Sequence, residues 1–310
     1  MAPLHSNPFR PILSVTVTAE SEGDRERLTE ALTECAGTPP SFTATTDSDS
    51  GVVKLRGESE EDLAAICTRL RSEYQIDIAV SPPQVLYLET ILKTSEGEGK
   101  YIRQTGGRGN YGHVKIRLEP QDSGAGITFI NEIHSGVIPE PYFHPIEQGI
   151  REAARGGILA GLEFVDFKAT LYDGSHHEAD SNPMAFHTAA TLAFKEAARR
   201  ADPIVIEPIM TTAFSTIESR LSETLAEINS LRGRVEEVAT THGVTTVRAL
   251  VPLCEMLGYQ GPAAHAMHFS CYKRTNWPPG NDAANASVSN PRNPRPNTGS
   301  SAVSPDWDWT

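Results

Sequence analysis

The segment from Gly99 to Pro120, GKYIRQTGGRGNYGHVKIRLEP, has the pattern of two strands joined by a glycine-rich turn. Apolar and polar residues alternate along His113–Leu118, which is the period of a strand with one buried face. The centre of the segment holds four glycines, Gly106, Gly107, Gly109 and Gly112. Glycine permits tight turns and close backbone approach, and Arg108 and Tyr111 suit contacts with phosphates and bases. We therefore predict an exposed hairpin whose tip contacts RNA.

Three other interpretations of this hairpin have to be weighed against RNA contact. The spacing Gly107-x-Gly109-x-x-Gly112 matches a dinucleotide-binding fingerprint, but that fingerprint opens a helix, whereas a strand pattern follows here. The extension to Val114 also matches the glycine-rich loop of protein kinases, yet the sequence contains no HRD and no DFG motif. Both of these interpretations are disfavoured. A hairpin that contacts no partner stays open.

The distribution of charge favours a local RNA contact over general nucleic-acid binding. The chain of 310 residues carries a net charge of −13, which opposes non-specific attraction to a polyanion. The stretch Lys100–Arg117 nevertheless contains five basic residues and no acidic one. These residues are Lys100, Arg103, Arg108, Lys115 and Arg117. A basic hairpin on an acidic chain is typical of a selective contact.

The composition also limits the cellular setting and the class of site that we expect. No apolar run approaches the length of a membrane span, and the first residues lack the pattern of a signal peptide. The four cysteines are widely spaced, without a CxxC pair, at Cys35, Cys67, Cys254 and Cys271. Reduced thiols in the cytoplasm, with no membrane association, no metal and no cofactor, are the expectation.

The order of strand-like and helix-like segments predicts an α+β protein with several domains. Residues 11–81 follow the order βαββαβ, which is that of a ferredoxin-like plait, and residues 204–273 repeat it. Residues 82–203 contain the hairpin and two helices, the second over 184–200. We expect Phe186, Leu192 and Phe194 to lie on the inner face of that helix. Residues 1–10 form an extension, and 274–310, rich in Pro, Asn, Ser and Gly, are predicted to be disordered.

A polar loop precedes the second of those helices and is the other candidate site. It reads DGSHHEADSN over residues 173–182. A metal site is disfavoured because neighbouring residues of an extended chain point to opposite sides. Contact with RNA and simple exposure to solvent both stay open.

Four segments together resemble one protein family. They are GKYIRQTGGRGNYGHV (99–114), FINEIHSGVIP (129–139), AFKEAARRADPIVIEPIM (193–210) and VPLCEMLGY (251–259). The chain resembles the C-terminal half, domains III, IV and V, of elongation factor G and its translocase and ribosome-protection relatives. The resemblance implies two ferredoxin-like plaits on either side of a domain with an unusual left-handed βαβ arrangement. It also implies that loop tips of the middle domain enter the decoding centre of the ribosome.

The resemblance implies a set of contact residues and partners. The tip loops of the family match Thr105–Tyr111 and His176–Asn182, and a histidine that eukaryotic relatives modify matches His177. The candidate contacts are Thr105, Gly106, Gly107, Arg108, Gly109, Asn110, Tyr111, His176, His177, Asp180 and Ser181. The implied partner is the ribosome, both its ribosomal RNA and the messenger and transfer RNA of the decoding site.

The sequence lacks the motifs that GTP hydrolysis requires. There is no G-x-x-x-x-G-K-[ST] motif, and the one Gly-Lys pair, Gly99-Lys100, is followed by Tyr101 instead of Ser or Thr. We therefore expect that the chain is not an enzyme, although the family is one of GTPases. An acidic segment at 57–63 replaces a family pattern that faces the GTPase domain. The alternative function is a degenerate paralogue, or half of a split translocase, that acts as an interaction module with a separate GTPase.

Overall fold

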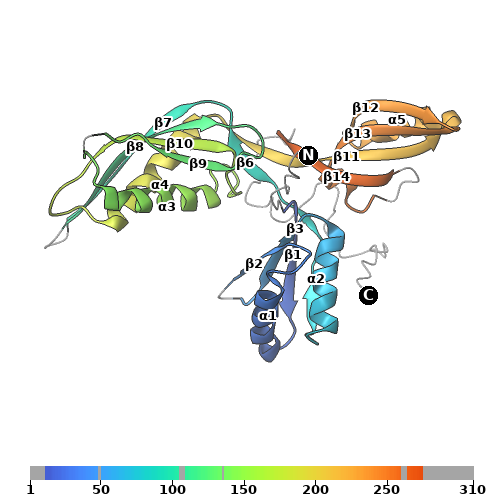
Figure 1. Cartoon of the computed structure of the whole chain (residues 1–310), viewed down its shortest axis with the longest axis horizontal. Coiled ribbons are helices and arrows are strands. Elements are labelled where there is room, and N and C mark those ends of the chain that lie inside the picture. The colour runs from blue at the N-terminus through green and yellow to red at the C-terminus, as the bar shows by residue number, and fades with distance from the viewer. Residues whose placement is uncertain (1–10, 48–49, 105–108, 135, 260–263, 275–310) are drawn as a thin grey trace, which may run out of the picture. The chain divides into compact units, whose positions relative to one another are not determined.

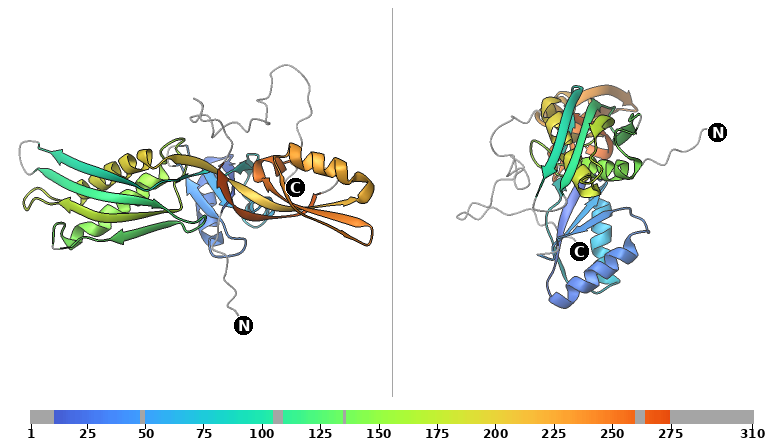
Figure 2. Two further views of the ribbon diagram at one scale, coloured as in Figure 1. Left: turned by 90° about the horizontal axis from the view of Figure 1, so that it is seen from above. Right: turned by 90° about the vertical axis from the view of Figure 1, so that its left-hand side faces the viewer.

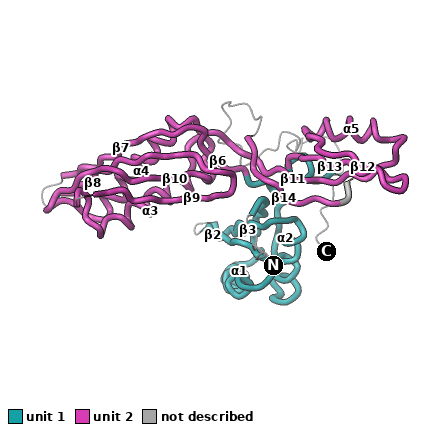
Figure 3. The backbone as a smooth tube through the Cα atoms, turned by 45° about the horizontal axis from the view of Figure 1, so that its top comes forward, with its two compact units in different colours: residues 1–86, 253–262, 296–310 teal, residues 87–252, 263–295 magenta. Residues whose placement is uncertain are grey.

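The computed structural model describes most of the chain. The described ranges are 11–47, 50–104, 109–134, 136–259 and 264–274. The predicted extension at 1–10 and the predicted disordered tail from 275 onward lie outside these residues. Two compact units make up the chain, residues 1–86 with 253–262 and 296–310, and residues 87–252 with 263–295 (Figure 3).

The first unit contains the predicted ferredoxin-like plait. Its strands are β1 (Leu13–Ala19), β2 (Thr43–Thr46), β3 (Val53–Gly57) and β4 (Ile78–Val80), in the sheet order β2-β3-β1-β4 with antiparallel pairing (Figure 1). A short strand that the sequence did not indicate, β5 (Gln84–Val85), also pairs with β1. The helices are α1 (Glu22–Cys35) and α2 (Glu60–Ser72). This order confirms the prediction from the sequence.

The helices of this unit bury the residues that the 3.6-residue period selects. Helix α1 buries Leu28, Ala31, Leu32 and Cys35, and helix α2 buries Leu63, Ile66, Cys67 and Leu70. Ser21 and Ser59 cap the two N-termini by accepting hydrogen bonds from the backbone N–H groups of Asp24 and Asp62. Each helix therefore begins directly after its capping serine.

The second unit begins with a strand pair and then a four-stranded sheet. Strand β6 (Leu88–Ile91) pairs with the first residues of β11 (Pro203–Ile217). The sheet has the order β7-β8-β10-β9, from β7 (Ser95–Arg103), β8 (Asn110–Pro120), β9 (Ile127–Asn131) and β10 (Phe167–Ser175). Strands β9 and β10 are parallel, and the other neighbours are antiparallel. The predicted glycine-rich hairpin is thus formed by β7 and β8.

Two helices cover one face of this sheet. They are α3 (Phe143–Arg155), preceded by the turn η1 (Glu140–Tyr142), and α4 (Pro183–Arg200). Both pack against the sheet and against each other (Figures 1 and 2). The segment β9-α3-β10 is a parallel βαβ unit, as the resemblance implies. The other face of the sheet is open and carries the polar residues of each strand.

Helix α4 lies close to the sheet because glycines face alanines across the contact. A Cβ atom added at any of three glycines would overlap the backbone of α4: Gly97 at Ala193, Gly99 at Ala189 and Gly112 at Ala185. The prediction that Leu192 lies inside is wrong, since 44% of its surface is exposed. Residues two apart on a helix point roughly 200° apart. Burial of Phe194 therefore turns Leu192 outward.

The second unit ends with another plait. Strands β11, β12 (Arg234–Thr241), β13 (Val244–Pro252) and β14 (Ala264–Arg274) form the sheet β12-β13-β11-β14. Helix α5 (Leu221–Ser230), after the turn η2 (Glu218–Arg220), follows β11, and the short α6 (Leu253–Met256), which groups with the first unit, follows β13. The predicted βαββαβ order is confirmed. No helix among the described residues is long and apolar enough to cross a membrane.

A buried carboxylate fixes one end of the four-stranded sheet. Glu89 in β6 is fully buried and accepts four backbone hydrogen bonds from the loop between α3 and β10. The donors are the N–H groups of Ile158, Leu159, Ala160 and Leu162, at 2.6, 2.9, 2.8 and 3.2 Å. We call this end the base. Because one side chain accepts all four bonds, the conformation of this loop depends on Glu89.

Candidate nucleic-acid interface

Two loops that are distant in sequence meet at the end of the sheet opposite the base. Arg103 of β7 pairs with Asn110 of β8, and Ser175 of β10 pairs with His113 of β8. The β7–β8 turn and the loop from β10 to α4 therefore leave the sheet at the same end. Both contain candidate contact residues. We call residues 109–111 and 176–182 the tip surface.

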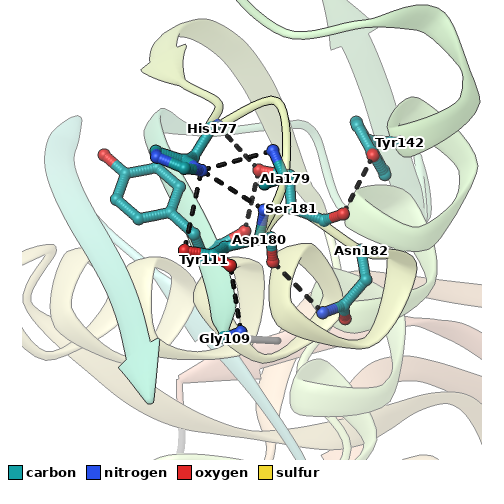
Figure 4. Close-up of polar contacts among 8 residues, drawn as sticks. All are labelled: Gly109, Tyr111, Tyr142, His177, Ala179, Asp180, Ser181 and Asn182. Atoms are coloured by element: carbon teal, nitrogen blue, oxygen red, sulfur yellow. Dashed lines mark hydrogen bonds and ion pairs between the residues drawn. The ribbon is translucent and has the colours of Figure 1, made fainter. Parts of the chain in front are cut away.

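Backbone and side-chain bonds join the two loops (Figure 4). The Tyr111 N–H donates to the Asp180 carbonyl at 2.8 Å, and Tyr111 forms a parallel β-bridge with Ser181. The Gly109 N–H donates to the Asp180 carboxylate at 2.9 Å across 71 residues of sequence. A Cβ at Gly109 would lie 2.9 Å from the Asp180 side chain. A larger residue here would therefore have to displace the Asp180 carboxylate that binds the Gly109 N–H.

Ser181 is buried, with 4% of its surface exposed, and it holds the loops together. Its Oγ donates to the Tyr111 carbonyl at 3.0 Å and accepts from the His177 N–H at 2.9 Å. Its own carbonyl accepts from the Tyr142 hydroxyl at 3.2 Å. The side chain of Ser181, a candidate contact, thus faces inward (Figure 4).

Asn182 links the tip surface to helix α4. Its Oδ1 accepts from the Ala185 N–H at 2.9 Å, which caps the helix, and Pro183 occupies the first turn. Its Nδ2 donates to Asn110 Oδ1 at 2.8 Å. Asn182 and Pro183 thus form a helix start whose cap also contacts the hairpin.

The side chain of His177 points outward and is 57% exposed. Its Nδ1 lies 3.3 Å from the backbone N–H groups of Ala179 and Asp180 and accepts from both. In the neutral imidazole, these two contacts place the proton on Nε2. The ring lies 6.2 Å from that of Tyr111 at a tilt of 49°. A tilted ring pair and an outward N–H are groups that a nucleobase or a phosphate can contact.

A third loop, between β9 and η1, borders the tip surface and was not among the predicted contacts. His176 Nδ1 lies 2.9 Å from the Val137 carbonyl, and Gly174 packs on Ile138. Tyr142 stacks on Phe186, with ring centroids 4.5 Å apart, while its hydroxyl reaches the tip surface. This loop belongs to the segment FINEIHSGVIP, one of the four that carry the family resemblance, but no pattern in that segment indicated a contact with His176.

The five basic residues of the hairpin differ in their pairing. Lys115 pairs with Asp173 at 3.0 Å, and Arg117 pairs with Glu96 at 3.5 Å. The hydrogen bond from Lys115 lowers the pKa of Asp173 and raises that of Lys115.

Two other hairpin cations, Lys100 and Arg103, are exposed on β7, and neither has an ion pair among the described residues. Their charge therefore stays open to a ligand. Residues 105–108, including Arg108 and three other candidate contacts, lie outside the described residues. Gly112, the last of the four glycines in the hairpin sequence, packs under α4. No group of His, Cys, Asp or Glu in the described part of the chain could hold a metal ion.

Comparison with known proteins gives a consistent picture. The family model described as "Elongation Factor G, domain III" matches residues 9–82, and "Elongation factor G, domain IV" matches residues 83–202. Elongation factor G of Aquifex pyrophilus is 42% identical over 271 residues, which cover 84% of this chain and 39% of that protein. A crystal structure of a Thermus thermophilus protein matches with a TM-score of 0.63 and 38% identity, covering 86% of this chain and 41% of that one. The chain thus spans about two fifths of the relatives it matches.

Proposed function

We propose that this chain, which carries domains III and IV of the elongation factor G family over residues 9–202, is a translation-related factor that binds the ribosome through its tip surface. The observation that carries this proposal is the junction of the two loops. Bonds from Gly109 and Tyr111 to Asp180 make one preformed surface from two distant segments. A preformed surface loses less entropy on binding than two independent loops would.

Charge supports RNA as the molecule that the tip surface contacts. Lys100 and Arg103 are exposed on the strand that leads to the tip, and the sequence adds Arg108 beside them. Phosphate contacts supply much of the affinity of proteins for nucleic acids, while aromatic rings stack on bases. Tyr111 and His177 provide rings at the end of this cationic strand. On an acidic chain, these groups favour binding at one place on a structured RNA.

We propose further that this chain does not hydrolyse GTP by itself. The matched domains are ones that follow the GTPase domain in the family, and the sequence lacks a phosphate-binding loop. If a cycle of binding and release exists, a GTPase domain outside these 310 residues would have to drive it. GTP turnover by the purified chain that persists through stringent purification would contradict this part of the proposal.

Sedimentation with ribosomes tests the main proposal. We expect the full chain to pellet with ribosomes at low salt and to be released as salt rises. Arg103→Ala and Arg108→Ala should each weaken binding about threefold to tenfold, as expected for loss of a charged contact. Arg200→Ala is the matched control, because Arg200 pairs with Glu196 at the far end of α4. A chain that stays in the supernatant, or tip variants that bind like Arg200→Ala, would overturn the proposal.

The acidic segment at 57–63 bears on the alternative of a module that binds a separate GTPase. Glu60, Glu61 and Asp62 occupy the first turn of α2, where the helix dipole favours negative charge. Burial, with Glu61 nearby, raises the pKa of Glu60. These acidic residues thus have a role within the helix. Co-purification of the chain with a purified elongation factor G GTPase domain would support the alternative, and its absence would count against it.

A further inference from the structure

Four side chains form a continuous line on the open face of the sheet and end at the tip surface. Tyr111 Oη lies 2.7 Å from Ser175 Oγ, and Ser175 Oγ lies 2.7 Å from His113 Nδ1. His113 Nε2 lies 2.7 Å from Glu98 Oε1. The residues come from β7, β8 and β10, so the line crosses three strands.

The contacts fix the direction of each hydrogen bond when His113 is neutral. The Glu98 carboxylate only accepts, so the proton of the imidazole is on Nε2 and Nδ1 is an acceptor. Ser175 has one hydroxyl proton and gives it to Nδ1. The Tyr111 hydroxyl must then donate to Ser175, which leaves only oxygen lone pairs of Tyr111 facing outward.

Protonation of His113 reverses this line. Both imidazole nitrogens are then donors, and Nδ1–H donates to Ser175. The Ser175 proton turns to the Tyr111 oxygen, so the Tyr111 hydroxyl proton turns outward. One added proton at His113 thus changes Tyr111 from an outward acceptor into an outward donor, with no change in covalent bonds.

We propose that His113, acting through Ser175, determines whether the Tyr111 hydroxyl donates to an RNA phosphate at the tip surface. This inference rests on the proposed function. A phosphate oxygen only accepts hydrogen bonds, so Tyr111 can bind it only as a donor. His113 does not reach the tip surface and is therefore a positioning residue. The tip surface binds RNA more tightly when His113 is protonated.

Charged groups on each neighbouring strand face His113. On β7, Glu98 binds the imidazole and Lys100 is the cross-strand partner of His113. On β8 and β10, Lys115 and Asp173 lie two pairs further along the strands and are bound to each other. Helices α3 and α4 cover the opposite face of the sheet. Of these charged groups, the Glu98 carboxylate is the one hydrogen-bonded to the imidazole.

Ribosome binding by the full chain at two pH values tests the inference, at constant ionic strength between about pH 6 and pH 8, where histidines titrate. We expect the wild type to bind about threefold to tenfold more tightly at the lower pH, the effect of one gained hydrogen bond. Ser175→Ala and Tyr111→Phe should lose this gain although both retain His113. A direct charge effect of His113 would survive in both variants.

Matched controls separate the possible outcomes. His187→Gln removes a histidine of α4 whose side chain lies 3.0 Å from Glu152 of α3, in the helical layer on the face of the sheet opposite the line, and should keep the full pH response. If Ser175→Ala and Tyr111→Phe respond to pH like the wild type, the inference is overturned and the proposed function stands. If no variant and no wild type binds ribosomes at either pH, the proposed function fails as well.

A second measurement on the free chain needs no ribosome. The ¹⁵N chemical shifts of the His113 ring should show the proton on Nε2 at the higher pH. The opposite tautomer would reverse every hydrogen bond in the line and would also overturn the inference.

Discussion

The base and the tip of the four-stranded sheet both use a carboxylate to hold a loop, but in different ways. At the base, Glu89 is fully buried and accepts four backbone N–H groups. At the tip, Asp180 is 24% exposed and accepts one, from Gly109. At the base, the carboxylate and the loop N–H groups that it binds are therefore all used in contacts within the chain. At the tip, the backbone is fixed while the His177 and Tyr111 side chains stay near solvent, where a ligand can reach them.

The largest predicted effect is at the base. Glu89→Gln replaces one carboxylate oxygen by an amide group that cannot accept from the loop N–H groups. We expect the free energy of unfolding to fall by about 2–4 kcal/mol, because buried donors lose their acceptor. Urea unfolding measures this change. Glu132→Gln, at an exposed position, is the control and should have little effect. Equal stability of both variants would contradict the role of Glu89.

A smaller effect is expected from Ser181→Ala at the tip. The variant leaves the Tyr111 carbonyl and the His177 N–H without their bonds, and both lie near the surface, where water can replace part of the loss. We expect a loss of about 1–2 kcal/mol in the free energy of unfolding. Binding to ribosomes should weaken by more than this loss explains, since the loops separate. Binding that is unchanged would mean that the junction does not matter for function.

Asp180→Asn should have a smaller effect on stability than Ser181→Ala. The amide oxygen can still accept from the Gly109 N–H, but the bond loses the assistance of the charge. We expect about 0.5–1.5 kcal/mol. Hydrogen exchange at the Gly109 amide measures the change at the bond itself. An exchange rate equal to that of the wild type would show that this bond does not form in solution.

Between the two ends, the Lys115–Asp173 pair should give the smallest effect. The pKa of Asp173 is lowered in the folded state, so the pair adds stability above the unfolded pKa and loses it as the pH falls through the folded pKa. Asp173→Asn should therefore be slightly less stable than the wild type near neutral pH. The difference should vanish between about pH 5 and pH 2. Unfolding curves across this range measure it, and a difference that grows in acid would contradict the pairing.

Periodicity was sufficient to predict much of the fold. It gave both plaits and the inner faces of α1 and α2, because each apolar residue there follows the helical period. It failed for Leu192, since α4 packs on the sheet through alanines and large side chains are not the best guide to its inner face. For α5 the helical period predicts an inner face of Leu221, Leu225, Ile228 and Leu231, but only Ile228 and Leu231 are buried, while Leu221 and Leu225 are half-buried.

The candidate site was less predictable than the fold. The two loops were located from the sequence, but their junction depends on tertiary contacts that no local pattern records. The line from Tyr111 to Glu98 depends on an irregularity between Leu171 and Asp173 in β10. With regular pairing Gly174 would face His113, whereas the extra residue places Ser175 there. The residues after the irregularity, Asp173, Gly174 and Ser175, include no large apolar side chain whose alternation would reveal the change of face.

Footprinting of the ribosome-bound chain by hydroxyl radicals tests the central claim most directly. Tyr111 and His177 lie on the tip surface, while Leu159, 48% exposed, lies at the base and provides a reference within the same molecule. We expect ribosomes to protect Tyr111 and His177 from oxidation and to leave Leu159 as reactive as in the free chain. Protection of Leu159 with Tyr111 and His177 unprotected would contradict the account.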